Sequence, residues 1–102
     1  MEIIETAVFE EDARRVFTER EYWSLIDHIA VYPDVGVIIP GGHGLRKLRW
    51  GSLGKGKRGG ARVIYYWYVS DAQVLLLRAY AKHETDDLSW DQVKYLYKLI
   101  KG

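Results

Sequence analysis

The sequence predicts an α+β fold in which a small antiparallel β-sheet has helices packed on one face, in two layers. Two observations lead to this prediction. Segments rich in β-branched and aromatic residues follow one another between residues 45 and 81, as consecutive strands do. On either side of them, apolar residues recur every three to four positions, which is typical of amphipathic helices. We expect the 102 residues to form a single domain, residues 1–102.

The first third of the chain is expected to form one strand and two helices. Residues 3–9 alternate as in a strand, and an acidic segment opens a short helix over residues 10–17, because negative charge suits a helix N-terminus. A second helix follows Thr18, which forms a capping box motif with Glu21, and Pro33 ends it. The apolar face of this helix consists of Tyr22, Leu25, Ile26, Ile29 and Ala30.

The rest of the chain is expected to form the sheet and a last helix. Three strands are predicted, at Leu45–Trp50, Ala61–Val69 and Val74–Ala81. A turn at Ser70–Gln73 joins the last two, and consecutive strands with short turns form an antiparallel sheet. Ser89, with Gln92 three residues later, caps the final helix. Its apolar stripe consists of Trp90, Val93, Leu96, Tyr97 and Ile100, which we expect to pack on the sheet.

A strong positive charge is concentrated in the middle of the chain. Between Asp34 and Asp71 there is no acidic residue, whereas the rest of the chain is negative overall. The basic residues of this segment are Arg46, Lys47, Arg49, Lys55, Lys57, Arg58 and Arg62. A concentrated positive segment predicts a polyanionic partner, and nucleic acid is the first candidate.

Several other classes of protein are not expected. The chain has no cysteine, so disulfides and thiolate ligands are excluded, and its acidic N-terminus does not resemble a signal peptide. No apolar run approaches the roughly 18 residues of a membrane span, so we expect a cytoplasmic protein without a membrane partner. His28, His43 and His83 are not spaced as metal ligands, and we expect neither a metal site nor a cofactor.

The glycine-rich segment resembles a phosphate loop only superficially. Gly51 and Gly56-Lys57 fit the spacing of that motif, but Arg58 stands where a magnesium-binding Ser or Thr belongs. A strand follows the segment, whereas a phosphate loop is followed by a helix whose N-terminus holds the phosphates. We therefore do not expect a nucleoside triphosphatase.

Cation chemistry on a phosphate group is what the residues of the basic segment permit. Alternation places Lys47 and Arg49 on one strand face, and Arg62 lies on a neighbouring strand. Arginine binds phosphate oxygens in pairs, and a lysine crowded by other cations can act as a general base. Such a cluster could cleave RNA without a metal by activating the neighbouring 2′-hydroxyl. On residue chemistry alone, a surface that only binds is the more common explanation of such a run.

The remaining cations of the segment are expected to have other roles. Arg46 should alternate away from its neighbours and cover apolar surface with its stem. Lys55, Lys57 and Arg58 should steer and hold phosphates of RNA or the ribosome.

Two adjacent motifs resemble a known family. The sequences GLRKLRW at residues 44–50 and GKGKRGGARVIYY at residues 54–66 are similar to the central motif of HigB-like toxins in the RelE/ParE superfamily. The resemblance extends to Phe9, to Glu21-Tyr22, to the turn at Pro33–Gly36 and to Tyr80–Glu84, and so covers nearly the whole chain.

This resemblance implies the toxin component of a type II toxin–antitoxin system. Such a toxin is a ribosome-dependent, metal-independent endoribonuclease, or mRNA interferase, which inhibits translation and needs no cofactor. Its implied partners are the ribosome with its mRNA and a cognate helix-turn-helix antitoxin of the HigA-like type. The implied catalytic residues are Lys47, Arg49 and Arg62, with Lys82 or His83 as the acid, and Arg46 joins the loop cations as an implied RNA contact.

Two features keep alternatives open. The tyrosine that RelE-type enzymes often carry near the C-terminus has no counterpart at residues 86–88. The superfamily also includes ParE-type toxins, which share the fold without the nuclease reaction. A non-nucleolytic inhibitor of DNA gyrase and a simple RNA-binding domain therefore remain as alternatives.

Overall fold

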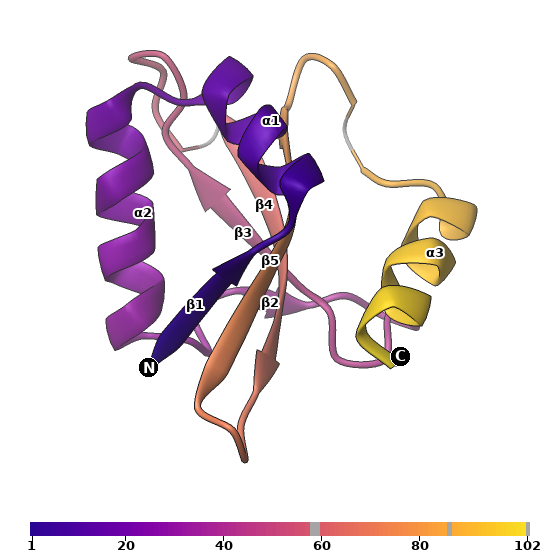
Figure 1. The fold of residues 1–102 in the computed structure, drawn as a ribbon. Coiled ribbons are helices and arrows are strands. Elements are labelled where there is room, and N and C mark those ends of the chain that lie inside the picture. Colours follow the sequence, from indigo (N-terminus) through magenta and orange to yellow (C-terminus); the bar gives the residue numbers. More distant parts are fainter. Residues whose placement is uncertain (58–59, 86, 102) are drawn as a thin grey trace.

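The computed structural model describes residues 1–57, 60–85 and 87–101, in which a five-stranded sheet is combined with helices (Figure 1). The strand order in the sheet is β1-β5-β4-β3-β2. Along the chain the elements are β1 (Glu2–Glu5), α1 (Ala7–Val16), α2 (Glu19–Val31), β2 (Val37–Ile38), β3 (Arg46–Trp50), β4 (Ala61–Tyr68), β5 (Gln73–Ala81) and α3 (Trp90–Lys101). The predicted α+β class is confirmed.

The sheet is mixed, whereas the sequence predicted an antiparallel one. The pairs β2–β3, β3–β4 and β4–β5 are antiparallel, and the last two join strands that the sequence predicted. β1, however, lies parallel to β5, with Ile3 opposite Val74 and Glu5 opposite Leu76. β4 pairs with one edge of β5 and leaves the other edge open for β1. After β1, the chain continues into helix α1, which packs on one face of the sheet.

The first strand is shorter than the predicted range of residues 3–9. Thr6 ends it, because the Thr6 hydroxyl accepts a hydrogen bond from the backbone N–H of Phe9 at 3.0 Å and so caps α1. The same hydroxyl donates to the carbonyl oxygen of Leu77 at 3.2 Å, which ties the start of α1 to β5. The predicted helix at residues 10–17 therefore begins three residues earlier, at Ala7, and Phe9 becomes a core residue.

The two predicted capping motifs are confirmed. In α2, the Thr18 hydroxyl accepts from the Glu21 N–H at 3.2 Å, and the Glu21 carboxylate accepts from the Thr18 N–H at 2.9 Å. In α3, the Ser89 hydroxyl accepts from the Gln92 N–H at 3.2 Å, and the Gln92 side chain accepts from the Ser89 N–H at 2.8 Å. Both helices thus begin where local sequence chemistry predicts.

Buried side chains form two clusters on opposite faces of the sheet. Helices α1 and α2 form the predicted layer on one face, and the first cluster joins them to the sheet through Phe9, Ala13, Val16, Phe17, Leu25, Ile29, Leu48, Trp50, Ala61, Val63, Tyr65, Val74, Leu76 and Ala79. Helix α3 instead packs against the other face, as Figure 1 shows. The second cluster consists of Leu45, Ile64, Leu77, Tyr80, Val93 and Leu96. Among the described residues, no helix is long and apolar enough to cross a membrane.

Candidate nucleic-acid interface

The strand register places Lys47, Arg49 and Arg62, here called the cation face, on the same side of the sheet. Arg49 of β3 is opposite Arg62 of β4, and Lys47 is opposite Ile64. Side chains of directly opposed residues point to the same face of an antiparallel pair. Because Ile64 packs in the cluster with α3, the cation face lies on the α3 side of the sheet, opposite helices α1 and α2.

Arg62 is a buried cation with only 5% of its surface exposed. Its Nη1 donates to the carbonyl oxygens of Lys57, at 3.3 Å, and Ala61, at 3.1 Å. A buried guanidinium needs such partners because desolvation of a charge is costly. These bonds fix its direction and tie the glycine-rich loop to the start of β4.

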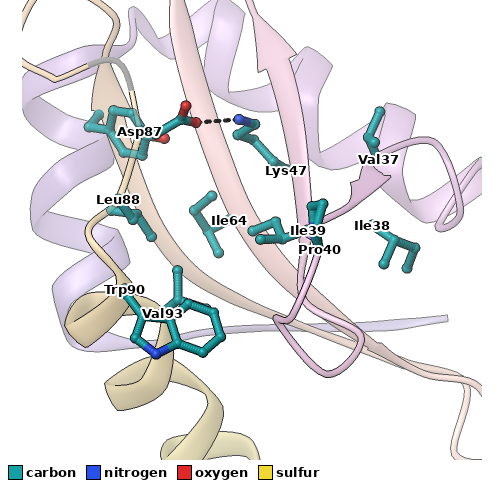
Figure 2. Close-up of a pocket in the computed structure, with 11 residues that line it drawn as sticks. Val37, Ile38, Ile39, Pro40, Lys47, Ile64, Asp87, Leu88, Trp90 and Val93 are labelled. Atoms are coloured by element: carbon teal, nitrogen blue, oxygen red, sulfur yellow. Dashed lines mark hydrogen bonds and ion pairs between the residues drawn. The ribbon is translucent and has the colours of Figure 1, made fainter.

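Lys47 forms an ion pair with Asp87, which lies just before α3 (Figure 2). The pair requires Lys47 to be protonated, and it links β3 to the segment that leads into α3. Because the Asp87 side chain is largely exposed, the pair is expected to contribute little to stability, at most about 1 kcal/mol. A phosphate group could therefore displace the Asp87 carboxylate at small cost. Arg49 is exposed on the same face.

Tyr80 lies near the cation face and was not predicted from the sequence to have a functional role. It lies opposite Arg62 in the β4–β5 register and is 4% exposed. Its hydroxyl has no hydrogen-bond partner within the part of the chain that the structure describes. Burial, assisted by the charge of Asp87 and opposed by that of Arg62, raises the pKa of Tyr80 to about 12. The phenol therefore stays neutral and keeps a proton to donate.

A pocket of about 370 Å³ opens between the sheet and α3 beside these residues. Figure 2 shows Lys47 and Asp87 at one end, Ile64 in the middle and Trp90 with Val93 at the other end. The full lining consists of Val37, Ile38, Ile39, Pro40, Lys47, Ile64, Tyr80, Asp87, Leu88, Trp90 and Val93. Trp90, predicted to pack on the sheet, is instead 55% exposed at the rim of this pocket.

Lys82 and His83 follow β5 in a turn and are exposed. The backbone N–H of Lys82 donates to the Gly60 carbonyl oxygen at 2.9 Å. His83 lines a second pocket, of about 210 Å³, together with Arg15 and Lys55. Among the described residues, this second pocket has no lining residue in common with the pocket of Lys47 and Tyr80. The structure thus groups Lys47 with Tyr80 but does not bring His83 into their pocket.

Arg46 lies on the opposite side of β3 from the cation face. Its Nη1 donates to the carbonyl oxygens of Asp34, at 3.0 Å, and Gly36, at 2.8 Å, and its guanidinium lies 5.9 Å from the centre of the Trp67 ring. These contacts give Arg46 a role in fixing the connection between α2 and β2. Contact with RNA through this side chain stays a prediction.

Glu21 holds the glycine-rich loop between β3 and β4, a role of Glu21 that was not predicted from the sequence. Besides capping α2, the Glu21 carboxylate accepts from the backbone N–H groups of Leu53, at 2.8 Å, and Gly54, at 3.0 Å. Although burial opposes the shift, the N–H groups of Thr18, Gly54 and Leu53 lower the pKa of the Glu21 carboxyl. The anionic form of Glu21 therefore orders this part of the loop.

The loop presents its lysines to solvent. Lys55 and Lys57 are exposed, and the Lys57 ammonium lies 4.7 Å from the centre of the Trp50 ring. Arg58, the third predicted phosphate-holding residue of the loop, lies outside the described residues. The exposure of Lys55 and Lys57 agrees with a binding role, because cations that hold a nucleic-acid backbone must be accessible.

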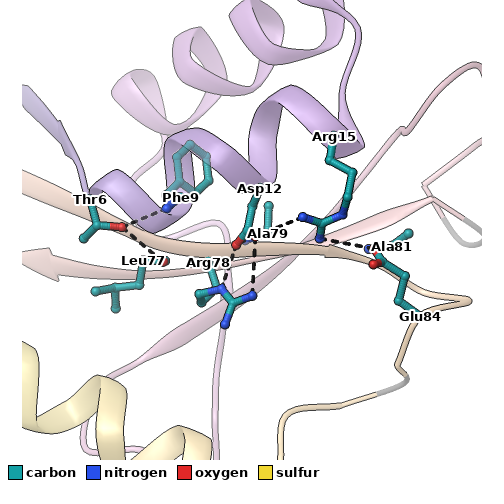
Figure 3. A network of polar contacts seen from close by, with 9 residues as sticks. All are labelled: Thr6, Phe9, Asp12, Arg15, Leu77, Arg78, Ala79, Ala81 and Glu84. Atoms are coloured by element: carbon teal, nitrogen blue, oxygen red, sulfur yellow. Dashed lines mark hydrogen bonds and ion pairs between the residues drawn. The ribbon is translucent and has the colours of Figure 1, made fainter.

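A network of polar contacts holds the far end of β5 to α1 (Figure 3). The Asp12 carboxylate is buried and accepts from Arg78 Nε at 2.7 Å, from the Ala79 N–H at 3.0 Å and from Arg15 at 3.3 Å. Arg15 also contacts Glu84, at 3.4 Å, in the turn that carries Lys82 and His83. The turn is thereby anchored to α1.

Comparison with known families adds no assignment, since no protein-family model matches the chain. Within the described residues, no three His, Asp or Glu side chains are grouped as they would be to hold a metal ion. The candidate site is therefore defined by its own geometry: the cation face, the pocket beside it and the exposed lysines of the loop.

Proposed function

We propose that this protein is the toxin of a type II toxin–antitoxin system and that it cleaves mRNA on the ribosome. The observation that supports the proposal is the position of Lys47, Arg49 and Arg62 on one sheet face beside an open pocket. Lys47 is paired with a largely exposed carboxylate, that of Asp87, which an anionic ligand could replace at small cost. The motif resemblance at residues 44–50 and 54–66 directs the proposal to RNA on the ribosome.

In the proposed reaction, the scissile phosphate displaces Asp87 from Lys47 and lies between Lys47 and the two arginines. The 2′-hydroxyl of the preceding nucleotide loses its proton and attacks phosphorus, and the bond to the 5′-oxygen breaks. Arg62, whose direction is fixed by backbone carbonyls, and Arg49 stabilise the charge on the phosphate oxygens. The products are a 2′,3′-cyclic phosphate and a 5′-hydroxyl, so the reaction consumes no water in this step.

The proton transfers are assigned from residue chemistry and from the motif resemblance. Lys47, once Asp87 has left and its own proton is lost, is the proposed base for the 2′-hydroxyl. Lys82 and His83, in the turn after β5, are the proposed donors to the 5′-oxygen. The exposed Lys55 and Lys57 hold ribosomal RNA or the mRNA backbone.

The proposal includes the partners and the compartment that such a toxin requires. A cognate helix-turn-helix antitoxin would cover the cation face and neutralise it, and the site of action would be the cytoplasm. Coexpression of the neighbouring gene, if it encodes such an antitoxin, is expected to restore growth of cells that express this chain.

The test is cleavage of mRNA on purified ribosomes, mapped by primer extension. We expect defined 5′ ends within codons with the wild-type chain, and none with Arg62→Ala or Lys47→Ala variants that remain folded. Lys98→Ala, which removes an exposed lysine of α3, is the matched control and is expected to cleave normally. Growth arrest with intact messages and stalled DNA replication would reject the nuclease and favour a gyrase inhibitor. Salt-dependent RNA binding without toxicity would favour a simple binding domain.

A further inference from the structure

The pocket beside the cation face has the properties of a site for a small organic ligand. Its volume of about 370 Å³ is within the range of roughly 300–1,000 Å³ that is usual for such sites. Its walls are largely apolar, being formed by Val37, Ile38, Ile39, Pro40, Ile64, Leu88 and Val93. A ligand that fills this apolar pocket would remove its walls from water, which favours binding.

The two ends of the pocket differ in chemistry. At one end lie the Lys47 ammonium and the Asp87 carboxylate, which form an ion pair. At the other end lies the Trp90 ring (Figure 2). The ion pair is largely exposed on the Asp87 side and therefore weak, so an anionic group of a ligand could replace the Asp87 carboxylate beside Lys47 at small cost.

Trp90 is held at the pocket rim by the backbone of the loop before β3. Gly41 has φ +71°, a conformation that favours glycine, and a Cβ added to it would lie 2.9 Å from the Trp90 ring. The loop therefore approaches the ring as closely as glycine permits. One side of the ring is supported by this backbone, while 55% of the residue remains exposed.

We propose that this pocket binds the nucleobase that adjoins the phosphate at Lys47, with the base packed against Trp90. The inference rests on the proposed function and names the part of the substrate that this site takes. A nucleotide combines an anionic phosphate with a flat and largely apolar ring, and the pocket offers a cation at one end and an aromatic ring at the other.

The binding test uses the full chain without ribosomes and is independent of cleavage. The four nucleoside 5′-monophosphates and ribose 5-phosphate are titrated, with the indole N–H signals of the tryptophans followed by nuclear magnetic resonance. We expect the nucleotides to bind more tightly than ribose 5-phosphate and to shift the Trp90 signal, which a Trp90→Phe variant identifies. Trp90→Ala is expected to weaken nucleotide binding by about 5- to 150-fold, the usual effect of losing one base–aromatic contact.

Two further variants separate the parts of the site. Trp23 on α2 is 53% exposed and lies outside the pocket lining, so Trp23→Ala is the matched control and should leave nucleotide binding unchanged. Lys47→Ala is expected to weaken the binding of nucleotides and of ribose 5-phosphate by a similar factor, since its ammonium is assigned to the phosphate that they share.

The inference is overturned if the nucleotides bind no more tightly than ribose 5-phosphate, or if the Trp90 signal is unmoved by every nucleotide. It is also overturned if Trp90→Ala binds nucleotides like the wild type. If the base-dependent binding is found while ribosomes and mRNA stay intact, the proposed nuclease reaction fails but the nucleobase pocket stands.

Discussion

Arg49 lies directly opposite Arg62 across the antiparallel pair of β3 and β4. Like charges in this arrangement destabilise a sheet by roughly 0.2–1 kcal/mol, and Arg62 is buried besides. The backbone carbonyl groups of Lys57 in the loop and of Ala61 at the start of β4 accept hydrogen bonds from Arg62, whereas Arg49 is exposed to solvent. The pair therefore places two like charges side by side on the cation face, and this opposition leads to the first prediction.

Arg49→Thr is expected to stabilise the fold and to impair function. Threonine suits an exposed strand position, and its introduction removes the repulsion, so the free energy of unfolding should rise by about 0.2–1 kcal/mol in urea denaturation at low salt. The gain should shrink at high salt, because screening weakens the repulsion in the wild type. Cleavage on ribosomes should fall at least tenfold. A variant that loses both stability and activity would contradict the proposed conflict between the two arginines.

Asp87→Asn is expected to increase the affinity for RNA. The substitution removes the carboxylate that competes with phosphate for Lys47, and an exposed pair worth at most about 1 kcal/mol limits the gain to roughly fivefold. Filter binding or anisotropy with a short single-stranded RNA measures the change. Asp91→Asn, on the first turn of α3, removes an equal charge outside that pocket and is the control. Equal gains from both variants would show that only net charge matters.

Asp12→Ala is expected to destabilise the protein by about 3–5 kcal/mol. The buried carboxylate accepts hydrogen bonds from Arg78, Arg15 and the Ala79 N–H, and its removal leaves these donors without their anion. Urea denaturation measures the effect, and Asp27→Ala on the exposed side of α2 is the control, with an expected change below about 0.5 kcal/mol. A loss of less than 1 kcal/mol for Asp12→Ala would mean that the network in Figure 3 does not hold α1 to β5.

Glu21 is expected to make stability depend on pH in the acid range. Backbone N–H groups bind its anion and, against the effect of burial, lower the pKa of its carboxyl from the ordinary 4.5. Its contribution is therefore complete above pH 4.5 and is lost as the pH falls through the lowered pKa of the folded state. Glu21→Gln should cost about 1 kcal/mol at pH 7 and less at pH 3, as measured by urea denaturation. Glu19→Gln is the control, and a cost that does not change with pH would contradict the role of the anion.

The sequence predicted the elements whose signals are local. The starts of α2 and α3 are marked by two capping pairs three residues apart, Thr18 with Glu21 and Ser89 with Gln92. The strands at 45–50, 61–69 and 74–81 follow from their β-branched and aromatic composition. Thr6 is not recognisable as a cap from the sequence, because the side chains around it alternate as they do in a strand. The parallel pairing of β1 has no local signal at all.

The candidate site was predictable only in part, for the same reason. Alternation along β3 is enough to place Lys47 and Arg49 on one face, and the adjoining strand β4 brings Arg62 to it. The positions of Tyr80 and Asp87 depend on the register of β5 and on the path into α3, which link distant parts of the chain. Trp90 fits the apolar stripe of α3 by spacing, but it lies beside Gly41 at the pocket rim, where α3 no longer covers the sheet.

The pairing of β1 with β5 joins two distant parts of the sequence, since the Gln73 side chain donates to the Glu2 carboxylate across a separation of 71 residues. β1 can thus be paired only after β5 has been synthesised, and long-range closure of this kind slows folding. Loss of the N-terminal strand would leave the cation face intact in sequence while uncovering one edge of β5. A shortened chain of this kind would be prone to pair with other copies of itself through that edge.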